Sequence, residues 1–167
     1  MTVRRTQALP APAVTCLAVI LGVLLGGCQV PGGAGERPSA VPVVAIVDGD
    51  TIRVDLGGET ERVRLLGIDT PELGRGGTAD EPCAVEARER LAELIGDQIV
   101  LVPDPAQGDR DRYGRLLRYA DTPEGVDAGL VLVAEGLADL YWAADDITRW
   151  DDYLRAYDEA PAPACAG

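Results

Sequence analysis

Residues 41–66 read VPVVAIVDGDTIRVDLGGETERVRLL and contain three β-strand patterns separated by two turn signals. Residues 41–47 are rich in valine and end at Asp48-Gly49, a dipeptide typical of hairpin turns. Residues 51–56 alternate polar and apolar side chains, as a half-buried strand does. A Gly-Gly pair then precedes a third strand pattern at residues 61–66. The stretch predicts a meander of three antiparallel strands.

Two more strands and three helices are predicted downstream of the meander. Apolar side chains that recur about once per helical turn predict helices at residues 83–96, 128–135 and 147–159. Strand patterns lie at residues 98–102 and 116–119. This order of elements predicts an α+β fold, a small closed β-barrel with helices packed against it.

The composition of the 167-residue chain excludes several kinds of active site. The chain has 28 acidic residues against 15 basic ones, a formal net charge of −13, and every basic residue is arginine. Histidine is absent, which excludes a Ser-His-Asp triad, a histidine general base and histidine-ligated zinc or iron. The four cysteines contain no C-x-x-C pair, so a structural zinc site is excluded too. Any catalysis must use carboxylates, arginines, hydroxyls or thiols.

Residues 1–27 have the features of a bacterial export signal. Arg4 and Arg5 precede an apolar run over residues 11–25, which is shorter than the roughly 20 residues that a membrane-spanning helix needs. The run ends in Leu-Gly-Gly-Cys28, which resembles a lipobox, the motif whose cysteine is lipidated and becomes the first mature residue. We expect lipidation of Cys28; an ordinary secretory signal cut nearby is the alternative.

The mature chain is expected to be a lipid-tethered and strongly acidic domain. Residues 28–40 are rich in Gly and Pro and predict a flexible tether, and residues 41–167 predict the folded domain. Removing residues 1–27 leaves 13 arginines against 28 acids, a net charge of −15. We expect the protein at the outer face of the cell membrane, or secreted.

The cysteines that remain after export are expected to pair. Cys16 leaves with the signal and Cys28 would be acylated, so the thiols that remain are those of Cys83 and Cys165. Because exported proteins enter an oxidising compartment, we expect a disulfide between these two residues.

Three charged segments stand out: DGDT at residues 48–51, RLLGIDTPE at residues 64–72, and DRYGR at residues 111–115. Taken singly, each has a purely structural interpretation. The first is a hairpin turn, the second is a strand end followed by a proline turn and a helix cap, and the third is a solvated hairpin tip. Taken together, the three segments indicate a site.

The acidic members of these segments suit a calcium site. Asp50, Asp69 and Thr70 offer hard oxygen ligands, which Ca²⁺ requires at about 2.3–2.6 Å. Glu72 lies three residues beyond Asp69, near enough to orient a water without being a ligand itself.

The arginines of the same segments suit a phosphate. Arg64 and Arg115 each present a planar fork that matches two phosphate oxygens and stays charged near neutral pH. A metal, a carboxylate base and two guanidiniums are the groups that phosphodiester hydrolysis needs.

These three segments, followed by Gly-Leu-Ala at residues 136–138, resemble the staphylococcal nuclease (thermonuclease) family in order and approximate spacing over residues 41–159. The resemblance implies an OB-type five-stranded barrel with three helices. It also implies a calcium-dependent endonuclease that cuts DNA and RNA to leave 3′-phosphates. We expect a monomer that prefers single-stranded or locally unpaired nucleic acid.

The resemblance also assigns roles to individual residues. Asp50 and Asp69 match the family's calcium carboxylates, and Thr70 matches its carbonyl ligand. Glu72 matches the general base. Arg64 and Arg115 match the two arginines that contact the phosphate.

A second group of residues matches the family's substrate contacts. Arg112 and Tyr113 match the basic residue and the tyrosine that hold a terminal phosphate. Trp142, with Tyr141 beside it, falls at the position where the family stacks a nucleobase. Either ring could do so, because an aromatic ring can stack on any base. Packing of these aromatic rings on the barrel is the alternative.

The chain departs from the family in its charge and in its short last helix. Nucleic-acid affinity normally comes from basic side chains that replace counterions, so a net charge of −15 predicts weak long-range attraction to nucleic acid.

Two other functions are alternatives to a nuclease. One is a non-catalytic OB-type binding module; the other is a calcium-dependent adhesion or envelope lipoprotein.

Overall fold

A computed structural model describes residues 38–163 and residue 165. The expected signal segment, Cys28 and most of the tether lie outside the described residues. None of the helices in the described part is long and apolar enough to cross a membrane.

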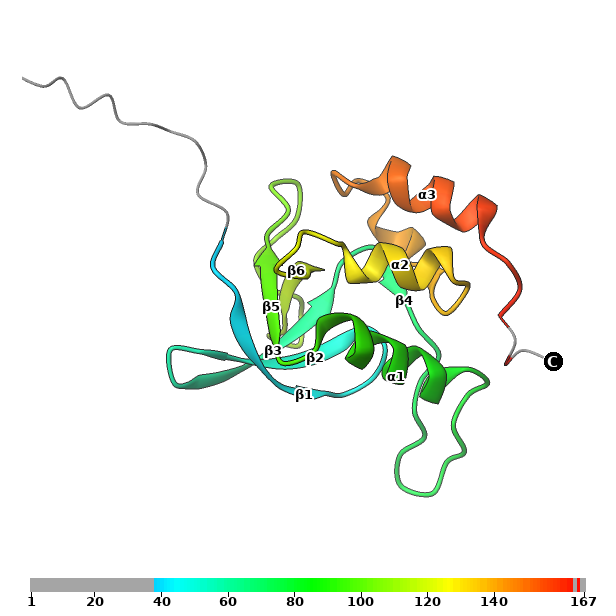
Figure 1. Cartoon of the computed structure of the whole chain (residues 1–167), viewed down its shortest axis with the longest axis horizontal. Helices are drawn as coiled ribbons and strands as arrows, with labels where there is room; N and C mark the ends of the chain where they lie inside the picture. Colours follow the sequence, from blue (N-terminus) through cyan, green and yellow to red (C-terminus); the bar gives the residue numbers. More distant parts are fainter. Residues whose placement is uncertain (1–37, 164, 166–167) are drawn as a thin grey trace, which may run out of the picture. The chain divides into compact units, whose positions relative to one another are not determined.

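Five strands form a closed barrel in the order β1-β2-β3-β6-β5 (Figure 1). The strands are β1 (Val41–Ile46), β2 (Thr51–Leu56), β3 (Glu59–Leu65), β5 (Gln98–Val102) and β6 (Leu116–Asp121). Strands β1, β2 and β3 make the predicted meander, since both of their pairings are antiparallel. The barrel closes through a parallel pairing of β3 with β6, which the sequence pattern did not reveal.

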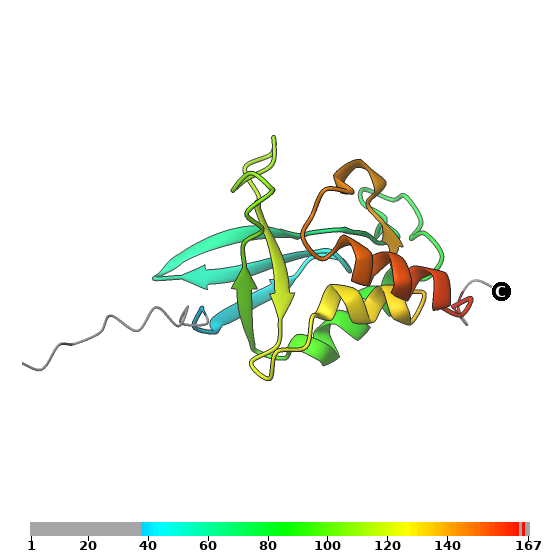
Figure 2. The same cartoon turned by 90° about the horizontal axis from the view of Figure 1, so that it is seen from above.

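Three helices cover one side of the barrel: α1 (Ala84–Ile95), α2 (Ala128–Ala134) and α3 (Trp150–Glu159). Helix α2 lies between α1 and α3 (Figures 1 and 2). The core is made of Val, Leu, Ile and Ala side chains together with two buried tyrosines, Tyr119 and Tyr153. The predicted α+β fold, a closed barrel with helices packed on it, is confirmed.

Three short elements lack a sequence pattern because they span only two or three residues. Strand β4 (Ile68–Asp69) pairs antiparallel with β7 (Asp139–Leu140), and a single 3₁₀ turn, η1 (Trp142–Ala144), follows. Their register sets Asp69 opposite Asp139. The β4–β7 pair therefore brings the second charged segment against the two residues that follow the Gly-Leu-Ala segment.

Helix α3 begins at Trp150, so the prediction of a helix from residue 147 is wrong at its start. The reason is Asp104, a buried carboxylate in the loop after β5. It accepts hydrogen bonds from the backbone N–H of Thr148 at 2.7 Å and from the Thr148 hydroxyl at 2.8 Å. These bonds hold the residues before Trp150 in a turn.

The buried tyrosines explain how the chain builds a core without phenylalanine. A buried tyrosine needs a partner for its hydroxyl. The Tyr119 hydroxyl donates to Asp104, and the Tyr153 hydroxyl donates to Asp127 at 2.9 Å. The two rings, 6.3 Å apart between centroids, join β6 to α3.

A disulfide joins Cys83, just before α1, to Cys165 beyond α3. The Cα atoms are 5.3 Å apart across a sequence separation of 82 residues. In Figure 1 the chain descends from α3 toward the start of α1, where this bond lies.

Replacing Asp104 by Asn is expected to destabilise the fold by about 2–3 kcal/mol at neutral pH, because charge-assisted hydrogen bonds are lost. Burial alone would raise the pKa of Asp104, but hydrogen bonds from Tyr119, Thr148 and Ala106 outweigh it and lower the pKa below 3.8. A lowered pKa stabilises the fold above the unfolded-state value, and that stabilisation is lost as the pH falls through the folded-state value.

Urea unfolding of both proteins between about pH 7 and pH 2 measures the effect. The difference between parent and Asp104→Asn should be largest at neutral pH and should shrink below about pH 4. A difference that stays constant over this range would contradict the assignment.

Candidate active site

The Asp48-Gly49-Asp50 turn between β1 and β2 is held against two other elements. The backbone N–H of Val47 donates to the carbonyl of Thr51 at 2.9 Å, which closes the turn. A Cβ at Gly49 would lie 2.8 Å from Cγ2 of Thr70 and 2.9 Å from Cβ of Ala87. Only glycine allows this approach, so the turn sits between α1 and the segment after β4.

Arg64, near the end of β3, is the centre of the site. One guanidinium nitrogen pairs with Asp50, and the other donates to Oδ1 of Asp69 at 2.8 Å. Only 12% of the Arg64 side chain is exposed, and Asp50 is buried. Two carboxylates from separate elements therefore converge on one cation.

Thr70 completes this group from the segment that follows β4. Its backbone N–H donates to Oδ2 of Asp50 at 3.1 Å. Its buried hydroxyl has no hydrogen-bond partner within the described residues. Asp50, Asp69 and Thr70, the three expected metal ligands, are thus adjacent.

The donor set fits a hard cation such as Ca²⁺. Within residues 38–163 and 165, no three His, Cys, Asp or Glu side chains gather closely enough to hold a metal ion by themselves. Two carboxylates with one carbonyl would be supplemented by water, as Ca²⁺ sites commonly are. Both carboxylates already lie around the positive charge of Arg64.

Burial and the repulsion between neighbouring carboxylates raise the pKa values of two aspartates at this site. Burial first, and then the charge of Asp50, raise the pKa of Asp48 to about 6, and Glu72 adds to the effect. Burial also raises the pKa of Asp69, although Arg64 opposes the shift. A further cation would favour the ionised form of these carboxylates.

Arg115 is connected to Asp50 through a hydroxyl. Its Nε is 2.7 Å from Oδ2 of Asp111, and its Nη1 donates to the Thr51 hydroxyl at 3.4 Å. That hydroxyl in turn donates to Oδ1 of Asp50 at 2.9 Å. The structure therefore places Arg115 on the same site as Arg64, on the β6 side.

Arg112 and Tyr113 lie at the tip of the loop that precedes β6. The Arg112 guanidinium stacks 4.7 Å from the centroid of the Tyr113 ring and donates to its hydroxyl at 2.6 Å. Arg115 approaches the same ring at 5.5 Å. Tyr113 is 64% exposed, so this pair can meet a ligand from solvent.

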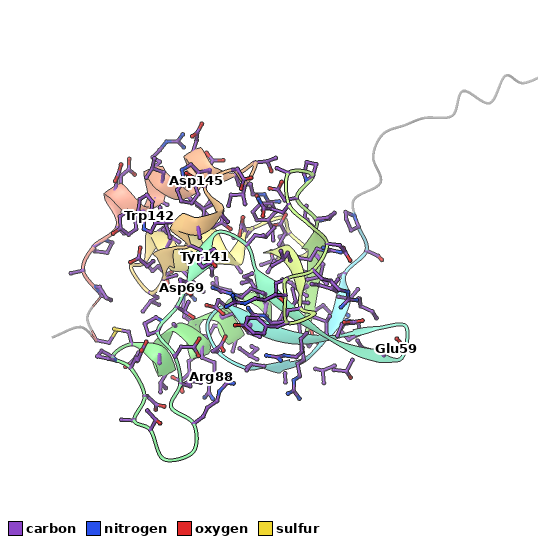
Figure 3. All side chains as sticks on the ribbon, turned by 180° about the vertical axis from the view of Figure 1, so that it is seen from behind. Glu59, Asp69, Arg88, Tyr141, Trp142 and Asp145 are labelled. Atoms are coloured by element: carbon purple, nitrogen blue, oxygen red, sulfur yellow. A yellow bond between two sulfur atoms is a disulfide. The ribbon has the colours of Figure 1, made fainter. Side chains whose placement is uncertain are left out.

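The two candidate stacking rings lie in different places. The Arg64 guanidinium is 5.6 Å from the Tyr141 ring centroid, so Tyr141 borders the site. Trp142 instead meets the edges of Trp150 and Tyr157 at 5.5 and 5.8 Å, against α3. Both remain about half exposed. Figure 3 shows Asp69, Tyr141 and Trp142 in sequence across one face.

A groove of about 700 Å³ borders the site next to Asp69 and Thr70. Its walls include Leu137 and the proline-rich segment 160–163 after α3. Its volume lies in the range that ligand sites of proteins usually have.

Glu72 is exposed and follows Pro71 in the loop after β4. Burial and Asp50 account for most of the raised pKa of Asp48, and the charge of Glu72 contributes least. Arg75, in the same loop, lies with its Nη2 3.5 Å from Oδ2 of Asp48. The sequence placed Thr51 and Asp111 in the charged segments but gave them no role, because the contacts they make depend on side-chain direction. It missed Arg75, whose partner Asp48 is distant in sequence.

Comparison with known proteins identifies relatives over most of the domain. Residues 62–163 match the family model described as Staphylococcal nuclease homologue. The chain is 37% identical over 145 residues to micrococcal nuclease of Shigella flexneri, covering 82% of this chain and 72% of that protein. It is 31% identical over 107 residues to thermonuclease of Staphylococcus hyicus, covering 64% of this chain and 63% of the relative.

Other relatives are longer than the matched region. Endonuclease YncB of Bacillus subtilis is 33% identical over 109 residues, covering 65% of this chain and 51% of that protein. An endonuclease of prophage origin in the same species matches over 36% of its own length.

Replacing Arg64 by Met is expected to lower the stability of the metal-free protein by about 3–5 kcal/mol, because Asp50 loses its buried counter-charge. Added Ca²⁺ should raise the Tm of this variant more than that of the parent, since the ion would replace the missing positive charge. Thermal unfolding with and without Ca²⁺ measures both effects.

Arg53→Met, an exposed change on β2, is the matched control and should behave as the parent does. An equal rise in Tm for all three proteins would show that Ca²⁺ binds away from Arg64.

Proposed function

The chain belongs to the staphylococcal nuclease family, and on that premise we propose that it is a calcium-dependent endonuclease that hydrolyses phosphodiester bonds of DNA and RNA. The observation that carries the proposal is the convergence of Asp50 and Asp69 on Arg64, with Arg115 joined to the same group. This arrangement unites acidic ligands with two phosphate-binding forks.

Asp50, Asp69 and the Thr70 carbonyl would hold the ion. When bound, Ca²⁺ supplies positive charge that offsets the negative charge developing on the phosphate. Arg64 bridges the two carboxylates, so its guanidinium is held at the edge of the site.

The arginines would bind and orient the scissile phosphate. Arg64 is held by two carboxylates and Arg115 by Asp111, so both guanidiniums lie at the site before the phosphate binds. A guanidinium carries five N–H donors, and those that the carboxylates leave free would donate to phosphate oxygens. Arg112 and Tyr113 would hold a second phosphate, and Tyr141 offers the ring nearest the site for stacking a base.

Glu72 would act as the general base. Its carboxylate accepts a proton from water as the water oxygen attacks phosphorus. The bond from phosphorus to the 5′ oxygen then breaks, and that oxygen takes a proton from solvent. The products are a 3′-phosphate and a 5′-hydroxyl, the outcome that the family resemblance implies.

We further propose that the mature protein is exported and anchored by a lipid on Cys28. The support is the sequence of residues 1–40 alone: an apolar run, a lipobox-like ending and a Gly- and Pro-rich tether. Secretion after an ordinary signal cleavage remains the alternative.

Degradation of plasmid DNA and of RNA by the purified domain, with Ca²⁺ and with a chelator, tests the proposed activity. Cleavage that requires Ca²⁺ supports a nuclease. Binding without cleavage would instead identify a non-catalytic OB-type module, and neither would favour a calcium-dependent envelope protein.

Glu72→Gln is expected to lower the cleavage rate by about 10²–10⁴, because the amide keeps the shape but cannot take the proton. Arg64→Ala should cost at least roughly 3–4 kcal/mol of transition-state stabilisation. Arg64→Lys should not restore the rate, since an ammonium cannot make the planar two-point contact. Asp50→Ala should first raise the Ca²⁺ concentration needed.

Single-turnover cleavage of a short oligonucleotide at saturating Ca²⁺ measures these rates, after each variant is shown to be folded. If Glu72→Gln and Arg64→Ala both cleave within about threefold of the parent, the assigned site is wrong.

Salt is expected to weaken substrate binding only mildly. The acidic chain offers few phosphate contacts beyond Arg64, Arg112 and Arg115, and about three contacts to a single strand predict a slope of log K against log salt near −2. Binding of a labelled oligonucleotide across a salt series gives the slope. A value steeper than about −5 would reveal a basic groove elsewhere.

A further inference from the structure

The loop that carries Glu72 closes on itself through Glu81. The backbone N–H of Glu72 donates to Oε2 of Glu81 at 2.9 Å. The backbone N–H of Glu81 donates in return to the carbonyl of Glu72 at 3.0 Å. Both backbone polar groups of Glu72 are therefore bound to one residue, nine positions further along the chain.

A second hydrogen bond stiffens the same loop. The backbone N–H of Gly74 donates to Oδ1 of Asp80 at 2.8 Å. A Cβ at Gly74 would collide with the carbonyl oxygen of Thr78, so the two arms of the loop are packed closely. Glu72 itself is exposed and lies outside any helix or strand, so its direction depends on these loop contacts.

Glu81 is in turn fixed to the start of α1. Its carbonyl accepts a hydrogen bond from the backbone N–H of Ala84 at 3.1 Å. Between them Cys83 adopts a left-handed conformation with φ of 70°, which is uncommon for a residue other than glycine. Such a conformation persists only where the surroundings impose it, and the bond to Cys165 is one such constraint.

The far end of this covalent link is also held. The segment after α3 packs so closely on Gly136 that a Cβ there would collide with the carbonyl oxygen of Pro161. The chain of constraints thus runs from this segment through Cys165 and Cys83 to Glu81, and from Glu81 to the backbone of Glu72.

We propose that Glu81 is a positioning residue for Glu72, and that the Cys83–Cys165 disulfide makes this positioning depend on the redox state of the compartment. The inference rests on the proposed nuclease function. The oxidised protein would have full turnover, and the reduced protein, as it exists before export, would cleave slowly. Substrate and Ca²⁺ binding would change little, because Asp50, Asp69 and Arg64 lie outside the loop.

Glu81→Ala tests the hydrogen bond. We expect kcat to fall by about 10- to 100-fold, because a displacement of the order of an ångström costs that much, while KM and the half-saturating Ca²⁺ concentration stay within about threefold. Glu81→Gln should stay within about threefold of the parent, since its amide oxygen accepts the same N–H bond. Glu89→Ala removes an exposed carboxylate on α1 and is the matched control.

Opening the disulfide tests the covalent link. The paired change Cys83→Ser, Cys165→Ser should lower kcat by about 3- to 10-fold in the parent but by less than about twofold in the Glu81→Ala background, because both changes act through the same contact. Reduction of the parent with a phosphine should reproduce the first effect. All variants are compared well below the Tm of the least stable one.

Each outcome decides a separate point. If the parent cleaves and Glu81→Ala matches it, the positioning role is wrong while the nuclease proposal stands. Equal losses for Glu81→Gln and Glu81→Ala would show that the charge acts rather than the hydrogen bond, which also overturns the role. Additive losses from Glu81→Ala and the cysteine pair would overturn the redox link. A parent without cleavage overturns this inference together with the proposed function.

Discussion

The ion pairs of Arg64 with Asp50 and Asp69 are the interaction on which the rest of the site depends. A guanidinium that is almost fully removed from water must be paired, and here both partners are acids that would otherwise repel one another. The turn after β1, the end of β3 and strand β4 are therefore fixed to one point. Three further residues contact this group. Arg115 reaches Asp50 through the Thr51 hydroxyl, and the Thr70 backbone N–H donates to Asp50. The Tyr141 ring lies against the Arg64 guanidinium.

The strands and helices were predictable where a local pattern exists. Alternation in β2 and the glycine turns on either side of it specified the meander, and helical spacing specified α1. The parallel pairing of β3 with β6 was not predictable, because it joins segments about fifty residues apart through backbone bonds that leave no periodic signal. The prediction of where α3 begins failed for a similar reason, because the hydrogen bond from Thr148 to Asp104 joins residues that are far apart in sequence.

The candidate site was predictable as a set of residue types, because metal ligands and phosphate forks need particular chemistry. Its supporting contacts were not. Asp111 looked like part of a solvated tip, yet its carboxylate holds Arg115. Glu81 and Arg75 lie in a loop with no periodicity, and their partners are backbone groups or acids that only the folded chain brings near. Trp142 occupies the expected position in sequence, but its ring faces α3.

The disulfide gives the domain an unequal response to proteolysis. Cys83 and Cys165 close a covalent ring around α1, β5, β6, α2, β7 and α3, whereas β1 to β4 lie outside it. A cut within the ring, for example at the exposed tip before β6, leaves both pieces attached to one another. A cut in the glycine-rich loop between Glu72 and Glu81 instead leaves the first four strands joined to the remainder only by noncovalent contacts. Any cut before Cys83 divides the molecule in the same way, and the exposed Gly57-Gly58 turn between β2 and β3 is a second place where such a cut can fall.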